Sequence, residues 1–205
     1  MGPTRLAIIR RTKNRGGINN TGRSFACCST RRKSELIMLT TAIIYGSSRK
    51  DGNTRQVVDA IAAKISADVF DVSDYDISFY DYEHKNRDDN FLPLIEILLK
   101  YDCWIFASPI YWYTMSAQLK VFVDRLTDLL DIDLESASKL NGLHAALITT
   151  GVEDSCPTCY EDVFINTFNY LGINYRGCLY VNTRHGVDIS AAEIDFLTFV
   201  QLIAV

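Results

Sequence analysis

The segment 46–54, Gly-Ser-Ser-Arg-Lys-Asp-Gly-Asn-Thr, constrains the fold more than any other part of the sequence. It follows the hydrophobic run 41–45 and leads into an amphipathic helical pattern, so it connects a strand to a helix N-terminus. Helix N-termini bind anions through free N–H groups, and Arg49 adds a cation with bidentate geometry. Four further side chains can hydrogen-bond to phosphate oxygens: Ser47, Ser48, Asn53 and Thr54. The loop therefore predicts a site for a phosphate monoester.

Two better-known phosphate loops do not fit this spacing. The ATPase loop places four residues between its first glycine and Gly-Lys-Ser/Thr, whereas five residues separate Gly46 from Gly52 and Asn53 occupies the lysine position. The dinucleotide fingerprint needs a second glycine two residues after the first, where this chain has Ser48. The sequence thus argues against triphosphate hydrolysis and a dinucleotide fingerprint. An ordinary strand-to-helix turn without a ligand stays open.

From residue 39 onward, apolar runs of strand length alternate with amphipathic patterns of helix length. This alternation is typical of an α/β domain with a parallel sheet, here a three-layer sandwich with right-handed crossovers. We expect strands at 41–45, 69–72, 103–107, 143–149 and 174–181 and helices at 54–66, 91–100, 115–130, 160–171 and 194–203. The uncharged stretch 103–119 is interrupted by Ser108-Pro109, so no membrane-spanning helix is expected.

The charge is divided unevenly along the chain. Residues 1–38 hold nine Lys/Arg and one acidic residue, so 12 basic and 24 acidic residues remain in 39–205. An acidic body argues against nucleic-acid binding by the domain. We expect one domain at 39–205. Residues 1–38 have three open interpretations: a disordered basic extension or a start assigned too far upstream, an organelle-type presequence, or an arm for an anionic partner.

Three loops should meet at one edge of the sheet. Ligands of open parallel sheets bind beyond the carboxyl ends of the strands, which here lead into 46–54, 108–114 and 150–159. The second loop contains Tyr111-Trp112-Tyr113, whose flat surfaces suit a planar ring system, although partly buried packing is the alternative. A phosphate site and a ring site at one edge together point to flavin mononucleotide (FMN).

Three motifs in consistent order carry a family resemblance: Gly-Ser-Ser-Arg-x-x-Gly-Asn-Thr at 46–54, Ser-Pro-Ile-Tyr-Trp at 108–112 and Lys-x-Phe-x-Asp-Arg at 120–125. Over about residues 40–182 the chain resembles the flavodoxin-like NAD(P)H-dependent FMN reductases, with their quinone-reductase and iron-sulfur-flavoprotein relatives. The resemblance implies a five-stranded parallel sheet in order 2-1-3-4-5, bound FMN, and a homodimer or homotetramer with the flavin near the subunit boundary.

The resemblance also implies roles by position. The FMN phosphate would be held by Ser47, Arg49, Asn53 and Thr54, with Ser48 as a further candidate. The isoalloxazine would be bordered by Pro109, Ile110, Tyr111 and Trp112, and its pyrimidine edge approached by Thr150, Gly151 and Val152. Asp124 and Arg125 would fasten the third helix rather than act in catalysis.

The expected activity is hydride transfer from NAD(P)H to FMN and electron transfer to a small acceptor such as a quinone, a free flavin or a nitro or azo compound. The alternative is a non-enzymatic electron carrier of the flavodoxin type, although Arg49 favours the reductase. Because the flavin carries the chemistry, no catalytic residue is assigned. Candidates for proton donation to a quinone are Tyr111, Tyr113 and His185.

The cysteines and the acidic residues are the candidates for a redox or a metal site. Cys156-Pro157-Thr158-Cys159 has a C-x-x-C spacing, which leaves ordinary thiols, a redox pair and metal or cluster binding open. The acidic segment 74–90 is expected to be a solvated loop, and no metal site is predicted. Without a recognisable secretory signal we expect a cytoplasmic protein with reduced thiols.

We expect deletion of residues 1–38 to leave the flavin content and the melting temperature unchanged, because the fold pattern begins at residue 39. Absorbance at the flavin bands and a thermal unfolding scan of both chains check this. Loss of either property would show that this segment is part of the fold.

Overall fold

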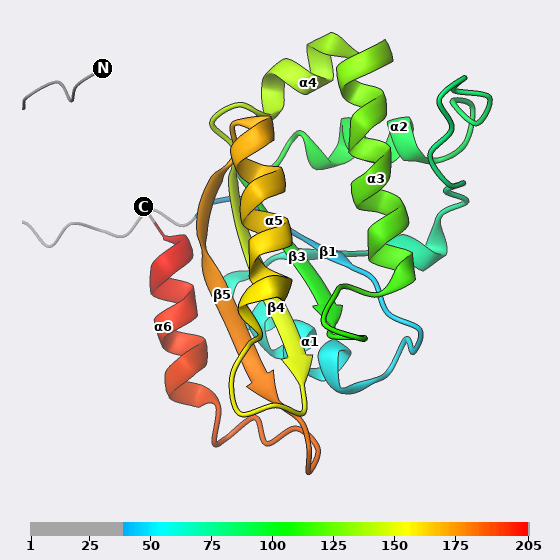
Figure 1. Cartoon of the computed structure of the whole chain (residues 1–205). Helices are drawn as coiled ribbons and strands as arrows, with labels where there is room; N and C mark the ends of the chain where they lie inside the picture. Colours follow the sequence, from blue (N-terminus) through cyan, green and yellow to red (C-terminus); the bar gives the residue numbers. More distant parts are fainter. Residues whose placement is uncertain (1–38, 205) are drawn as a thin grey trace, which may run out of the picture. The chain divides into compact units, whose positions relative to one another are not determined.

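The computed structural model describes residues 39–204, so the predictions for residues 1–38 lie outside the described part. Figure 1 shows a sheet covered by helices. The five strands are β1 (Thr41–Tyr45), β2 (Asp68–Asp71), β3 (Cys103–Pro109), β4 (His144–Gly151) and β5 (Asn174–Asn182). The helices are α1 (Asn53–Ile65), α2 (Phe91–Leu98), α3 (Ala117–Ile132), α4 (Leu134–Leu140), α5 (Thr158–Leu171) and α6 (Glu193–Ile203), and a 3-10 turn, η1, spans Val72–Asp74.

All neighbouring strands are parallel, and their order is β2-β1-β3-β4-β5, which confirms the predicted topology. The central strands β1 and β3 are buried along their whole length. Strands that are covered on both faces read as continuous hydrophobic runs, as these do in the sequence. The strand order reverses between β1 and β3: successive strands are added on one side of β1 first and on the other side afterwards. The carboxyl ends of β1 and β3 therefore flank the point where ligands bind in such folds.

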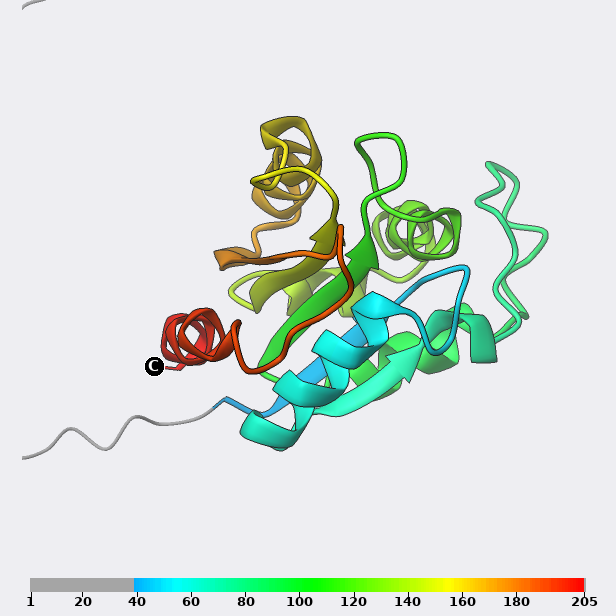
Figure 2. The same ribbon diagram turned by 90° about the horizontal axis from the view of Figure 1, so that it is seen from below.

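Helices cover both faces of the sheet. One core cluster joins the sheet to α1 and α6 through residues such as Val58 and Phe196. The opposite cluster joins it to α2, α3, α4 and α5 through Phe91, Phe122 and Phe164, among others. Figure 2, viewed from below, shows α1 and α6 on one side of the sheet and α3 and α5 on the other. Together these layers form the predicted three-layer sandwich.

The main differences from the sequence prediction are helix α4 and the ends of strands β3 and β4. Helix α4 was not predicted, because seven residues are too few to show a clear amphipathic period; the Asp133 side chain caps it by accepting from the Ser136 N–H at 3.2 Å. Strands β3 and β4 extend to Pro109 and Gly151, beyond the predicted ends at 107 and 149. Pro109 has no backbone N–H to donate to the sheet, and it is tolerated because it is the last residue of β3. The next residue, Ile110, donates its N–H to Thr150 O at 2.9 Å.

The loop after β1 is held tightly against the start of α3. A Cβ on Gly46 would lie 2.7 Å from the Leu119 backbone nitrogen, so only glycine fits. Ser116 Oγ donates to Gly46 O at 2.8 Å, and the Ser116 N–H donates to Ser108 Oγ at 2.8 Å. Because Ser108 belongs to β3, these bonds fix the ends of β1 and β3 and the start of α3 relative to one another.

Arg125 fastens the segment 74–90 to α3. Its fully buried guanidinium donates from Nε to Asp128 Oδ2 at 2.6 Å and from Nη1 to Ser78 O at 3.0 Å, and it also pairs with Asp89. Burial alone would raise the pKa of the Asp89 carboxyl, but hydrogen bonds from Arg125 and from two backbone N–H groups hold that pKa below its usual value. Arg125 is therefore structural, as expected. Asp124 instead pairs with the exposed Lys120 on the same helix, so its predicted role in fastening α3 is not seen.

We expect Arg125→Ala to lower the free energy of unfolding by about 3–5 kcal/mol, because the buried Asp128 carboxylate would lose its cation. Urea denaturation followed by circular dichroism measures the change. The matched control is Asp124→Ala, an exposed ion pair on the same helix, whose effect should stay below about 1 kcal/mol. Equal losses in the two variants would contradict the assignment.

Candidate functional site

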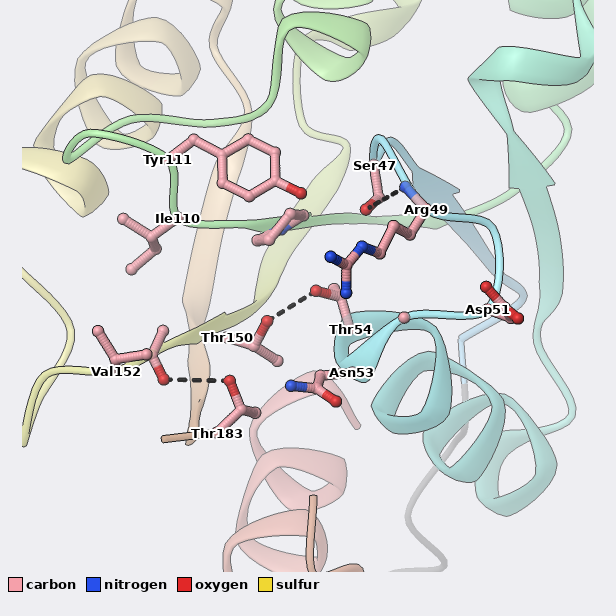
Figure 3. A pocket seen from close by; sticks show the side chains of 13 residues that line it. Ser47, Arg49, Asp51, Asn53, Thr54, Ile110, Tyr111, Thr150, Val152 and Thr183 are labelled. Carbon is pink, nitrogen blue, oxygen red and sulfur yellow. Dashed lines mark hydrogen bonds between the residues drawn. The ribbon is translucent and has the colours of Figure 1, made fainter. Parts of the chain in front are cut away.

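A cavity of about 590 Å³ lies at the carboxyl ends of β1, β3 and β4. This volume falls within the roughly 300–1,000 Å³ usual for small-molecule sites. Figure 3 shows side chains from four segments of the chain pointing toward it. The lining residues are Ser47, Arg49, Asp51, Gly52, Asn53, Thr54, Pro109, Ile110, Tyr111, Thr150, Gly151, Val152 and Thr183.

One end of the cavity is suited to an anion. Helix α1 begins at Asn53, and its N-cap residue is Gly52, which has no side chain. No side-chain cap therefore occupies the first N–H groups of the helix. In Figure 3 the Arg49 guanidinium extends into the cavity toward Thr54, whereas Asp51 lies on the outer side of the loop. The helix N-terminus and the guanidinium thus place positive charge at the same end.

Hydrogen bonds fix the loop that carries Arg49. The Tyr45 hydroxyl donates to Arg49 O at 2.6 Å, and Ser47 Oγ accepts from the Arg49 N–H at 3.3 Å. Ser47 itself is buried. The loop backbone is therefore held in place while the Arg49 side chain remains available to a ligand.

The middle of the cavity joins the first and third loops. Thr54 Oγ1 and Thr150 Oγ1 lie 2.7 Å apart, and both residues are buried. Thr183, which follows β5, completes this wall because its N–H and its hydroxyl donate to Gly151 O at 2.7 and 3.2 Å. The sequence prediction missed Thr183, although the rule that parallel strands end at one edge also applies to β5.

The opposite end is formed by the loop after β3. Tyr111 is 39% exposed and lines the cavity, and its backbone bonds to Thr114 in both directions, at 2.9 and 3.1 Å. Between them, Trp112 and Tyr113 have left-handed backbones, with φ of 48° and 65°. Such backbones cost of order 1–3 kcal/mol each in non-glycine residues. The tight turn leaves Trp112 94% and Tyr113 59% exposed, so these aromatic rings are not buried in the core.

A second cavity of about 190 Å³ adjoins the first. Its walls come from the aromatic loop, the loop after β4 and the edge strand: Ile110, Trp112, Tyr113, Gly151, Val152, Glu153, Pro157 and Tyr180. Ile110, Gly151 and Val152 line both cavities, so the two are separated only by these residues.

Most of the predicted site residues therefore surround one space. Ser48 and Trp112 are the exceptions: Ser48 is exposed and does not line the large cavity, and Trp112 lines the smaller one. Of the candidate proton donors, Tyr111 and Tyr113 line the large and the small cavity respectively, whereas His185 is exposed and lines neither.

Cys156 and Cys159, whose C-x-x-C spacing left a redox pair open as one interpretation, are free thiols in the structure. Cys156 and Cys178 are interacting neighbours, whereas Cys159 is exposed and lies with its Sγ 4.0 Å from Tyr113 O. Between residues 39 and 204, no three His, Cys, Asp or Glu side chains are placed to share a metal ion. No helix in the same range is long and apolar enough to cross a membrane.

Comparison with known proteins identifies the family. Residues 39–188 match the family model of the NADPH-dependent FMN reductases. A Bacillus subtilis (strain 168) protein that bears the name of an NAD(P)H-dependent FMN-containing oxidoreductase, YwqN, is 26% identical over 148 residues, covering 66% of this chain and 81% of its own.

Solved structures share the fold. The Trp repressor binding protein from Bacillus subtilis superposes with a TM-score of 0.64 at 22% identity, covering 80% of this chain and 97% of its own. An FMN-dependent NADH-azoreductase from Bacillus anthracis in complex with FMN superposes with a TM-score of 0.59 at 10% identity, covering 81% of this chain and 98% of its own. An NADPH-quinone reductase from P. pentosaceus superposes with a TM-score of 0.57 at 17% identity, covering 79% of this chain and 96% of its own.

These matches favour an enzyme over the flavodoxin-type electron carrier that the sequence left as the alternative. The sheet order is that of flavodoxin-like proteins, and the matched region contains the loop 46–54, the aromatic loop and the strand ends between them. The chain thus belongs to the NADPH-dependent FMN reductase family and is an NAD(P)H-dependent oxidoreductase with FMN as its cofactor.

Proposed function

We propose that the large cavity holds FMN, with its phosphate at the start of α1 and its ring beside Tyr111, and that the enzyme passes electrons from NAD(P)H to a quinone. The observation that carries the proposal is the polarity of this one cavity. Positive charge from Arg49 and α1 lies at one end and an aromatic side chain at the other, with hydroxyls between them. This sequence of groups matches a phosphate, a polyhydroxy chain and a planar ring.

The residues divide into groups under this proposal. The phosphate is bound by Ser47, Arg49, Asn53 and Thr54, which surround the free N–H groups of α1. Pro109, Ile110 and Tyr111 border the ring, and Thr150, Gly151 and Val152 approach its pyrimidine edge, supported by Thr183. Ser48 and Trp112 take no part in this cavity. Trp112 is instead assigned to the acceptor.

When bound, FMN supplies the chemistry by accepting a hydride and releasing electrons to a second substrate. The side chains bind and orient the substrates and exclude water from the reacting face. The second cavity, beside Trp112 and Tyr113, offers flat aromatic surfaces to a planar acceptor. The phenol of Tyr111 or Tyr113 can supply a proton to a quinone oxygen. A free flavin or a nitro or azo compound is a planar acceptor of the same kind.

We further propose that two copies of the chain associate next to the aromatic loop and that the enzyme works in the cytoplasm. Trp112 and Tyr113 together form an exposed aromatic surface at the mouth of the second cavity. Exposed aromatic surface of this kind is typical of protein interfaces. The described cysteines are free thiols, which accords with a reducing compartment.

We expect Arg49→Ala to raise the FMN dissociation constant roughly tenfold to a hundredfold, because a charge-assisted bond to phosphate contributes about 1.5–3 kcal/mol. Fluorescence titration of the flavin-free protein measures it. The matched control is Lys50→Ala, which removes the same charge from the same loop; Lys50 is exposed, pairs with Asp74 and lies outside the cavity lining. Equal weakening by both would indicate a general charge effect and contradict the assigned site.

We expect the FMN-loaded enzyme to oxidise NAD(P)H faster with a quinone than without one, measured as the loss of nicotinamide absorbance. Trp112→Ala should raise the KM for the quinone about two- to tenfold, from the loss of about 0.5–1.5 kcal/mol of aromatic contact, and leave FMN affinity unchanged. Tyr170→Ala, an aromatic residue 81% exposed on α5, serves as the control. No quinone-dependent turnover would exclude this acceptor class, and an unchanged KM would exclude Trp112 from its site.

A further inference from the structure

Two thiols meet behind the second cavity. Cys178 lies on the edge strand β5 opposite Leu147 of β4, and Cys156 lies in the loop between β4 and α5. Both side chains are partly buried and pack against the core cluster on the α5 side of the sheet. They are 22 positions apart in sequence, yet their side chains interact in the fold, and no spacing motif in the sequence indicates this.

The two thiols have unequal acidity. The interaction with the Cys178 side chain lowers the pKa of Cys156, and the same interaction together with burial raises the pKa of Cys178. Cys156 also directly precedes Pro157, the N-cap of α5, where the helix dipole favours a negative charge. Cys103, by contrast, is fully buried in β3, and burial raises its pKa to about 12. Cys156 is therefore suited to act as the nucleophile, with Cys178 as its adjacent partner.

We propose that Cys156 and Cys178 are a reversible oxidation site, at which a peroxide converts the two neighbouring thiols to a disulfide. The Cys156 thiolate attacks one oxygen of hydrogen peroxide, the O–O bond breaks, and a sulfenic acid and hydroxide form. The Cys178 sulfur then attacks the Cys156 sulfur and displaces a second hydroxide. With the protons from both thiols, one peroxide becomes two waters, and the pair loses two electrons to form one S–S bond.

The site adjoins the functional cavities. The loop from Val152 to Pro157 contributes to the second cavity, and β5 already holds it through the Tyr180 hydroxyl, which donates to Glu153 O at 2.6 Å. Asn182 Nδ2 donates to the same oxygen at 2.7 Å. A disulfide between Cys156 and Cys178 would add a covalent link between the same loop and the same strand. Oxidation at this site therefore acts on a wall of the second cavity.

The test uses the full-length, FMN-loaded protein, treated with hydrogen peroxide, alkylated and digested with trypsin without reduction. Cleavage after Lys139, Arg176 and Arg184 places Cys156 and Cys159 in the peptide 140–176 and Cys178 in the peptide 177–184. We expect mass spectrometry to find these two peptides joined, two hydrogens lighter than their sum, and separated again by dithiothreitol.

Three variants assign the bond. Cys156→Ser and Cys178→Ser should each abolish the joined peptides, whereas Cys159→Ser, the matched control in the same peptide as Cys156, should retain them. A bond confined within the peptide 140–176 would show Cys156 paired with Cys159 and would overturn the proposal. Oxidation to sulfinic or sulfonic acid without a disulfide, or no oxidation at either residue, would overturn it equally. Cys103, Cys27 and Cys28 lie in other tryptic peptides and do not interfere.

Discussion

The site depends on the close packing of the loop after β1 against the first turn of α3. Gly46 leaves no room for a side chain beside Leu119, and the hydroxyls of Ser108 and Ser116 join the strand ends to the helix start. Because these polar groups are buried, leaving any of them unpaired would cost about 1–3 kcal/mol. The position of the loop that carries Arg49 is thereby determined by the core. A binding loop that is fixed before the ligand arrives loses little conformational entropy on binding.

The strands and most of the cavity could be predicted because they follow from local patterns, whereas the sheet order was implied by the family resemblance. Hydrophobic runs indicated the strands, and the rule that parallel strands end at one edge brought together residues as distant as Ser47, Tyr111 and Thr150. The short helix α4 escaped because its seven residues are stabilised mainly by the contacts of Leu140 with the core. Packing of this kind depends on the tertiary structure and leaves no period in the sequence.

The directions of individual side chains could not be predicted from the sequence either. Ser48 and Trp112 stand in the right loops, but the turn between Tyr111 and Thr114 orients Trp112 toward the second cavity, and its backbone angles could not be read from residue type. The C-x-x-C spacing drew attention to Cys159 as a possible partner of Cys156, whereas the neighbouring thiol in the structure is Cys178. Cys178 reaches Cys156 only because β5 lies beside β4 in register. Pairings of this type require the three-dimensional structure.

The short contact between Thr54 and Thr150 links the first and third loops in the middle of the cavity through a single proton. Each hydroxyl has one hydrogen, and one of these two hydrogens is donated in the bond between the two oxygens. The hydroxyl that accepts keeps its own hydrogen for a ligand, so the pair offers one donor in all. If Thr54 provides it, the donor serves the α1 end, and if Thr150 provides it, the donor serves the β4 side. A ligand group that binds this donor on one side removes it from the other, which couples recognition by α1 and by β4 without any movement of the backbone.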